Sequence, residues 1–149
     1  MSVDSVNDYI QRCLPSIRSI GVTVQSADEK AVVLTAPLEL NDNGRGCAFG
    51  ASLYSIAMAS CWATMYMACE QRFGNPNIVA RDGQIRYRRP CKEAVITATC
   101  RNPNPRQWDG FFAHYEKAGQ TTLSLTSKIQ DGDEIAAYFD GVFVLLGED

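Results

Sequence analysis

The segment from Gly46 to Cys69 carries no charged residue, and this feature limits the possible folds of the chain more than any other. A helix formed by this segment is apolar on nearly all sides, so other parts of the protein or lipid must cover it. Four serine and threonine residues inside it, the lack of a second such segment and flanks of both charge signs argue against a membrane span. We therefore expect a long buried helix over 50–73 and no membrane partner.

The chain before this segment is predicted to form a helix and then two strands. Apolar residues recur at steps of three and four through the first 17 residues, which predicts an amphipathic helix that Pro15 stops or kinks. The stretches 22–25 and 30–36 are rich in Val and Thr and predict a hairpin. A loop dense in Asn, Asp and Gly at 39–46 then leads into the long helix.

After the long helix the apolar residues follow the two-residue period of β-strands. We predict strands over 78–89, 94–101, 121–130 and 134–146. The third alternates most clearly, with Leu123, Leu125 and Ile129 opposite polar residues, which is typical of an antiparallel sheet with one exposed face. Between the second and third strands, an aromatic-rich stretch predicts a short helix that ends at Gly119.

These elements predict a single α+β domain over residues 1–149, because no repeat, low-complexity tract or linker divides the chain. A curved antiparallel sheet wrapped around the long helix would cover its apolar surface. Such a sheet leaves an edge strand with unpaired backbone groups. Pairing of that edge with a second copy favours a homo-oligomer.

Composition argues against several partners and cofactors. A formal net charge of −3 and a pI near 5.1 do not suit a nucleic-acid partner or an anionic membrane surface. The six cysteines form no Cys-x-x-Cys motif, and none has zinc-ligand spacing to the single histidine, so we expect no metal. The first residues contain no basic stretch followed by an apolar run, which leads us to expect free thiols and a cytoplasmic location.

Two stretches resemble a known group of proteins. Residues 36–62, APLELNDNGRGCAFGASLYSIAMASCW, contain the pattern Asn43-x-x-Gly46-x-x-Phe49-Gly50-Ala51, which resembles the loop-and-helix motif of hotdog-fold acyl thioesterases. Residues 79–90, VARDGQIRYRRP, resemble the strand that follows in those enzymes. Nearly the whole chain is similar to the thioesterase family named after the YiiD C-terminal domain.

The resemblance implies a hotdog fold, in which the antiparallel sheet wraps around the long apolar helix. It also implies hydrolysis of an acyl-CoA or acyl-carrier-protein thioester, without a cofactor, at sites shared between the subunits of a homodimer or a dimer of dimers. The motif supports this chemistry at Gly50 and Ala51. The first N–H groups of a helix have no partner within it, and they can polarise a thioester oxygen if no side chain blocks its approach.

The chain departs from the family pattern at Met58. Many hotdog thioesterases carry an Asp or Glu on the helix one or two turns after the Gly pair, and Met58 occupies that place. Since methionine cannot activate water, we predict that Asp82, in the strand after the helix, is the general base. The alternating pattern of that strand lets Asp82 face the helix end across a dimer. The alternative is a turn or bulge carboxylate paired with Arg81 or Arg86.

The loop before the helix supplies the next candidates. We predict a catalytic role for Asn43, and we predict that Asn41 and Asp42 position water or contact the carbonyl group. The alternative is that these residues shape the loop or cap the helix.

The predicted substrate-binding residues fall into two further groups. Large side chains near the motif suggest an apolar or aromatic acyl group, although core residues look the same in sequence. Those side chains are Phe49, Tyr54, Trp62 and Tyr87, and Ser52 at the helix start is a further candidate. Arg81 and Arg89 belong to a basic cluster that suits the phosphates of coenzyme A or a carrier-protein arm, and the alternative is a solvated strand face.

Other activities fit the sequence less well. The dehydratase branch of the hotdog fold requires a histidine before the helix, whereas the single His114 lies in an aromatic segment far from it. The glycines at 44, 46 and 50 are spaced one residue too far apart for a dinucleotide-binding motif. Two alternatives stay open: another reaction on an acyl thioester, such as decarboxylation or acyl transfer, and a non-catalytic acyl-binding module.

Overall fold

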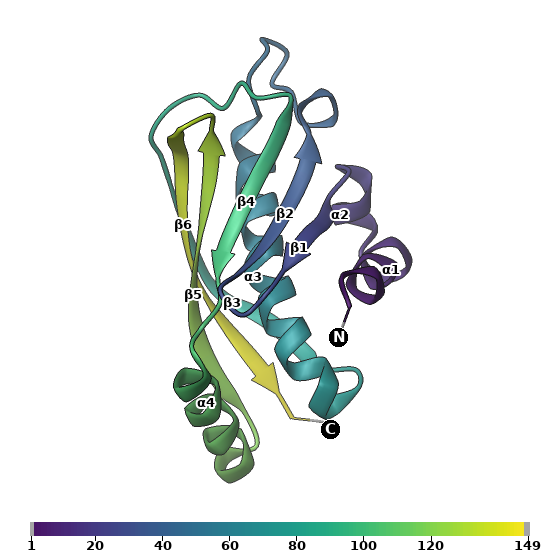
Figure 1. Cartoon of the computed structure of the whole chain (residues 1–149), viewed down its shortest axis with the longest axis vertical. Coiled ribbons are helices and arrows are strands. Elements are labelled where there is room, and N and C mark those ends of the chain that lie inside the picture. The colour runs from purple at the N-terminus through teal and green to yellow at the C-terminus, as the bar shows by residue number, and fades with distance from the viewer. Residues whose placement is uncertain (1, 148–149) are drawn as a thin grey trace.

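The computed structural model describes residues 2–147, and its centre is helix α3 (Gly50–Phe73). Six strands form one antiparallel sheet in the order β1-β2-β4-β5-β6-β3. The sheet curves around α3, with α1 and α2 on one side and α4 at one end (Figure 1). The predicted architecture, an antiparallel sheet wrapped around a long apolar helix, is therefore confirmed.

Burial of α3 follows from its uncharged sequence. Eleven of its residues are buried, among them Leu53, Ile56 and Met65. The helix begins at Gly50 and ends at Phe73, as predicted, and Gly74 is its C-cap. No helix within residues 2–147, α3 included, is both long and apolar enough to cross a bilayer.

The strands match the predicted segments to within a few residues, and β5 shows the predicted alternation of buried and exposed side chains. Ser127, which continues the buried face of β5, shares a 2.7 Å hydrogen bond with Ser60 of α3, a buried polar contact that the pattern did not predict. The strands are β1 (Thr23–Ala27), β2 (Ala31–Pro37), β3 (Asn77–Tyr87), β4 (Val95–Arg101), β5 (Thr121–Asp131) and β6 (Glu134–Leu146). A short 3₁₀ helix, η1 (Leu38–Leu40), follows β2.

The N-terminal helix breaks at Pro15, as predicted, into α1 (Val3–Cys13) and α2 (Pro15–Ser19). Helix α1 also covers the outer edge of the sheet at β1. The side chain of Asn7 donates to Val24 O at 3.1 Å and accepts from Val24 N at 2.7 Å. These two bonds satisfy the backbone groups that an edge strand would otherwise leave open at this position.

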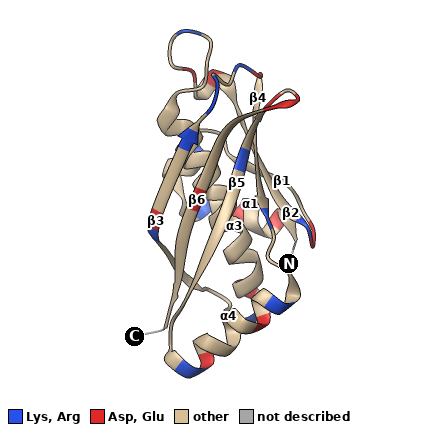
Figure 2. Ribbon diagram, turned by 90° about the vertical axis from the view of Figure 1, so that its left-hand side faces the viewer, with Lys and Arg blue, Asp and Glu red and all other residues tan. Residues whose placement is uncertain are grey.

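The opposite edge, β3, is different. It pairs with β6 on one side only and is the last strand of the sheet. Val79 on this strand is 41% exposed, and the ribbon in Figure 2 shows no element of the described chain lying against the free side of β3. A long strand edge of this kind invites pairing with another chain.

Helix α4 (Pro105–Ala118) occupies the predicted aromatic-rich stretch. It begins with a capping box, in which the Asn104 side chain accepts from Gln107 N while the Gln107 side chain accepts from Asn104 N. The helix ends before Gly119, as predicted, but it is 14 residues long and not short. Its Phe111 and Phe112 are buried, and it packs against β5.

All six cysteines are free thiols. Cys13 is exposed, Cys47 is half-buried, and the other four are buried: Cys61, Cys69, Cys91 and Cys100. Burial raises the pKa of the Cys69 thiol to about 12, and burial also raises the pKa of Cys91. Because the thiolate is the reactive form, these side chains are protected both by poor access and by protonation.

We expect a thiol reagent at mildly alkaline pH to label Cys13 quickly and Cys47 more slowly in the folded protein. The four buried thiols should react only after unfolding in denaturant. Peptide mass mapping of a labelling time course measures this directly. Rapid labelling of Cys69 without denaturant would contradict the packing described here, and intact disulfides under non-reducing conditions would contradict the free-thiol assignment.

Candidate active site at the start of the long helix

Two backbone N–H groups are free where α3 begins. Phe49 O accepts hydrogen bonds from Ser52 N and Leu53 N, and Phe49 N donates to Asn41 O at 2.7 Å. The N-cap side chain of Phe49 makes no capping bond. Within residues 2–147, Gly50 N and Ala51 N have no hydrogen-bond acceptor. A helix start with two open donors is suited to hold an oxygen that gains negative charge.

Aromatic side chains flank this helix start. The Tyr87 hydroxyl donates to Gly50 O at 2.8 Å, so the end of β3 is held against the first turn of α3. A Cβ at Gly50 would lie 3.3 Å from Tyr87 Oη, which leaves little room for a larger residue. Phe49 is 56% exposed and Tyr87 is 53% exposed. The structure thus brings together Phe49, Gly50, Ala51 and Tyr87, all of which the sequence analysis selected.

Two of the three polar loop candidates are held by hydrogen bonds to backbone groups. Asn41 is 2% exposed, and its Nδ2 donates to Ile20 O and Pro37 O. Its Oδ1 is buried and has no partner in the described part of the chain. Asn43 Oδ1 accepts from Arg45 N at 2.8 Å and from Cys47 N at 3.4 Å. These contacts correspond to the loop-shaping alternative for both asparagines.

Asp42 differs from its two neighbours. Its Oδ1 accepts from Gly44 N and Gly46 N, while Oδ2 has no hydrogen bond within residues 2–147. The residue is exposed, and its backbone forms an isolated antiparallel bridge with Ala48, two residues before the helix. Asp42 therefore places a carboxylate with one free oxygen on the exposed loop that precedes α3.

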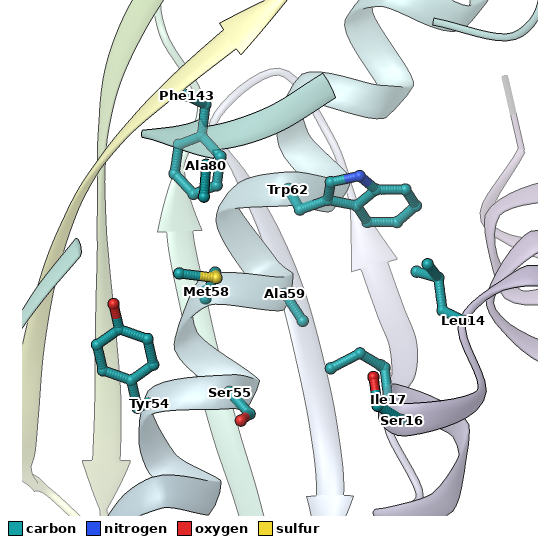
Figure 3. A pocket seen from close by; sticks show the side chains of 10 residues that line it. All are labelled: Leu14, Ser16, Ile17, Tyr54, Ser55, Met58, Ala59, Trp62, Ala80 and Phe143. Atoms are coloured by element: carbon teal, nitrogen blue, oxygen red, sulfur yellow. The ribbon is translucent and has the colours of Figure 1, made fainter. Parts of the chain in front are cut away.

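A cavity of about 370 Å³ runs along α3 just beyond the helix start. Figure 3 shows Tyr54 and Ser55 at one end of it, Met58 and Ala59 in the middle and Trp62 at the other end. The other lining residues come from three more parts of the chain. Ser16 and Ile17 belong to α2 and Leu14 directly precedes it, Ala80 belongs to β3, and Phe143 belongs to β6. No residue of the lining carries a formal charge, so the cavity suits an apolar group.

Sequence reasoning found only part of this cavity. Tyr54 and Trp62 were among the large side chains predicted near the acyl group, and Met58 was recognised as the residue in place of the usual carboxylate. Leu14 and Ile17 were assigned to the amphipathic N-terminal helix with no functional role. No local signal marks them, because their place in the lining depends on how the N-terminal helices pack on α3.

Asp82 lies on the face of β3 that points away from α3. A Cβ on the next residue, Gly83, would overlap the Tyr54 hydroxyl, so position 83 faces the helix and position 82 faces outward. Asp82 lines a separate polar hollow of about 360 Å³ on the outer side of the sheet, together with Gln84 and Asp140. Within the described residues the Asp82 carboxylate is not ion-paired, so the predicted alternative of a pair with Arg81 or Arg86 does not occur.

Some of the arginines on β3 and in the loop after it form ion pairs with acidic side chains. Arg86 pairs with Asp140 at 3.2 Å, and Arg89 bonds to Asp131 at 3.1 Å and to Glu134 at 3.4 Å. Arg81 is exposed and makes no ion pair within the described range. Figure 2 shows basic and acidic positions together along β3. Arg81 is thus the more available of the two predicted phosphate-binding residues.

Ser52 is half-buried in the first turn of α3, and its N–H is used by Phe49 O. Ser55 lines the cavity. Neither serine has a hydrogen-bonded histidine, because His114, the single histidine of the chain, lies on the exposed side of α4. This arrangement offers no activated serine nucleophile.

A six-stranded antiparallel sheet wrapped around one long helix is the arrangement of a hotdog-fold protein. The chain belongs to the family described as "Putative thioesterase (yiiD_Cterm)", which it matches over residues 3–147. The family and fold inferred from the sequence are both confirmed.

Solved structures agree with this assignment. A protein of unknown function from Chlorobaculum tepidum is 28% identical, with a TM-score of 0.90 and coverage of 98% of this chain and 94% of that chain. A protein named as a putative thioesterase from Shewanella oneidensis is 19% identical, with a TM-score of 0.81 and coverage of 97% and 96%. A thioesterase from Haemophilus influenzae is 11% identical, with a TM-score of 0.75 and coverage of 100% and 94%. The similarity to the Shewanella and Haemophilus proteins supports the fold alone.

Proposed function

We propose that the protein hydrolyses an acyl thioester carried by coenzyme A or an acyl carrier protein. The observation that carries this proposal is the pair of open N–H groups at Gly50 and Ala51 next to an uncharged cavity. The thioester oxygen lies against these N–H groups, and the acyl chain lies in the cavity. The family assignment supports thioester hydrolysis in general.

In the proposed reaction, a water oxygen attacks the thioester carbon and a carboxylate takes its proton. The carbonyl oxygen becomes negative in the transition state, where the two N–H groups stabilise it more strongly than in the bound substrate. The C–S bond then breaks, the sulfur leaves with the bonding electrons, and the protonated carboxyl group returns the proton. The products are a carboxylic acid and a free thiol, which balance the thioester and water consumed.

We assign the assisting carboxylate to Asp42. Its Oδ2 is free and its backbone pairs with Ala48, so the carboxylate lies on the loop that delivers the chain to the helix start. Asp82, which the sequence analysis preferred, points to the outer side of the sheet, away from Gly50 and Ala51 of its own subunit. Asp82 is therefore the second candidate, and it would have to act from another subunit.

The phosphate groups of the carrier would contact exposed basic residues near the site. Arg45 in the loop and Arg81 on β3 are exposed and make no ion pair within residues 2–147. Arg89 is held by Asp131 and Glu134, so it contributes to phosphate binding only if those bonds open. Arginine suits this role because its donors match phosphate oxygens.

A panel of acyl-CoA and acyl-carrier-protein thioesters, assayed for release of free thiol with purified protein, tests the proposal. We expect catalytic release for at least one apolar acyl group and a matching carboxylic acid in the product mass spectrum. Release of thiol with a different acyl product would indicate another reaction on the thioester, an alternative that the uncharged Met58 favours. Binding without any product would indicate an acyl-binding module.

We also propose that the active form is a homodimer, or a dimer of dimers, joined through β3. The edge at β1 is partly closed by Asn7, whereas β3 is open. Pairing of two β3 strands would continue the sheet and cover exposed apolar residues at that edge.

Sedimentation should therefore give twice the chain mass of 16.4 kDa or a higher multiple. Val79→Lys, which places a charge on the open edge strand, should shift the protein toward monomer. Val95→Lys is the matched control, because Val95 is 54% exposed but lies on the inner strand β4. An active wild-type monomer, or equal effects of the two substitutions, would contradict assembly through β3.

A further inference from the structure

We propose that Trp62 forms the end wall of the acyl cavity and limits the substrate to acyl groups of medium length. This inference rests on the proposed thioesterase function and adds to it the substrate class and the residue that sets it. Trp62 lies at the end of the cavity opposite Tyr54 and Ser55, and Leu14 from the α1–α2 junction lies beside it (Figure 3).

The cavity extends along α3, from the first turns of the helix toward its middle. Gly50 and Ala51 start α3, Tyr54 lies about one turn further on, and Trp62 lies about two turns beyond Tyr54. An acyl chain whose carbonyl oxygen meets the first N–H groups would therefore extend along α3 toward Trp62. Eight residues of helix separate Tyr54 from Trp62, which corresponds to about 12 Å.

The indole ring of Trp62 packs against two further aromatic rings. It stacks on Tyr66 at a centroid distance of 4.9 Å and on Tyr9 of α1 at 5.6 Å. Tyr9 and Tyr66 also contact each other at 4.6 Å, so the three rings form one cluster between α1 and α3. A ring fixed on this cluster acts as a rigid stop, whereas Met58 in the middle of the cavity has a flexible side chain that adapts to the chain passing it.

The size of the cavity agrees with a medium-length acyl group. An apolar cavity of about 150 Å³ accepts a benzene ring, so the 370 Å³ here accommodates an acyl group on the order of ten carbon atoms. The lining offers hydroxyl groups only at Tyr54, Ser55 and Ser16, so most of the acyl chain meets hydrocarbon and aromatic surface. A short or strongly polar acyl group would leave much of this surface uncovered.

The test compares hydrolysis of saturated acyl-CoA substrates of increasing length by wild type and Trp62→Ala. Removing the indole opens the end wall, so we expect the optimum of kcat/KM to move to longer chains. The ratio of long-chain to medium-chain kcat/KM should rise roughly tenfold or more, since even one methylene group in an apolar pocket has an effect of about this size. Leu14→Ala widens the same end without disturbing the aromatic cluster, and it should shift the optimum in the same direction.

Trp108→Ala is the matched control. Trp108 is also half-buried, stacks on Phe112 and meets Phe111 edge-on, but it lies on α4 and does not line the cavity. It should leave the chain-length profile unchanged. Calorimetric titration with non-hydrolysable thioether analogues of the same lengths gives a second profile that does not depend on hydrolysis.

The outcomes separate the two proposals. Wild-type hydrolysis with a profile that neither Trp62→Ala nor Leu14→Ala alters overturns the role of Trp62 and leaves the thioesterase function standing. Binding of the analogues without hydrolysis, with a profile that Trp62→Ala shifts, supports the end wall and overturns hydrolysis. If no acyl chain of any length is bound or hydrolysed, the function itself fails, and the role of Trp62 fails with it.

Discussion

Gly50→Val should lower kcat for thioester hydrolysis by roughly 10²–10³, the range found when one oxyanion donor is lost. The Cβ of residue 50 points at the Tyr87 hydroxyl, and only 3.3 Å separates them. The two methyl groups of valine would push Tyr87 aside and distort the first turn of α3. The N–H groups of Gly50 and Ala51 would then no longer converge on one oxygen.

Two milder variants separate the possible causes of that loss. Gly50→Ala adds only the Cβ, which a small movement of Tyr87 accommodates, so its activity should lie much closer to wild type. Tyr87→Phe removes the 2.8 Å hydrogen bond to Gly50 O but leaves residue 50 unchanged. Unfolding midpoints for all three variants show whether a loss is global. Full activity of a folded Gly50→Val variant would exclude the helix start as the oxyanion site.

Asp42→Asn should lower kcat by roughly 10²–10⁴, the usual contribution of a general base. Asparagine has nearly the same size and shape as aspartate. Asparagine keeps a carbonyl oxygen that can accept from Gly44 N and Gly46 N, so the loop conformation is retained while the charge and the basic oxygen are lost.

Asp82→Asn is the control for this experiment, because Asp82 is an equally exposed carboxylate that faces the outer side of the sheet. We expect it to change turnover little. The reverse result, a large loss in Asp82→Asn with normal turnover in Asp42→Asn, would return the base to the residue that the sequence favoured. It would also require Asp82 to reach the site through another subunit.

Local sequence patterns determined most of the secondary structure. The uncharged run and Gly74 set α3 at 50–73, and the two-residue alternation set β5 and β6. The helix-start motif was equally local, because open N–H groups at Gly50 and Ala51 are a property of the first turn of any helix. These features could be predicted because each depends on residues close together in the chain.

The side of the sheet on which Asp82 lies could not be predicted in this way. Alternation counted from Ile78 and Ala80 would place Asp82 on the side of α3. The β3–β6 register shifts between Ala80 and Asp82, and this bulge reverses the phase so that Gly83 faces α3 instead. Pairing of the two strands introduces such a bulge, and the period of one strand does not reveal it.

The tertiary structure likewise decided the contacts of Asn41 and the packing of the N-terminal helices. Asn41 is fixed by the carbonyl groups of Ile20 and Pro37, and the cavity is lined in part by Leu14 and Ile17, which lie far from α3 in sequence. The sequence by itself determined which residues form helices, strands and the first turn of α3, since backbone conformation and amphipathic faces are local. Only the packed structure decided which side chains meet, because a site assembled from α2, α3, β3 and β6 depends on how separate elements come together.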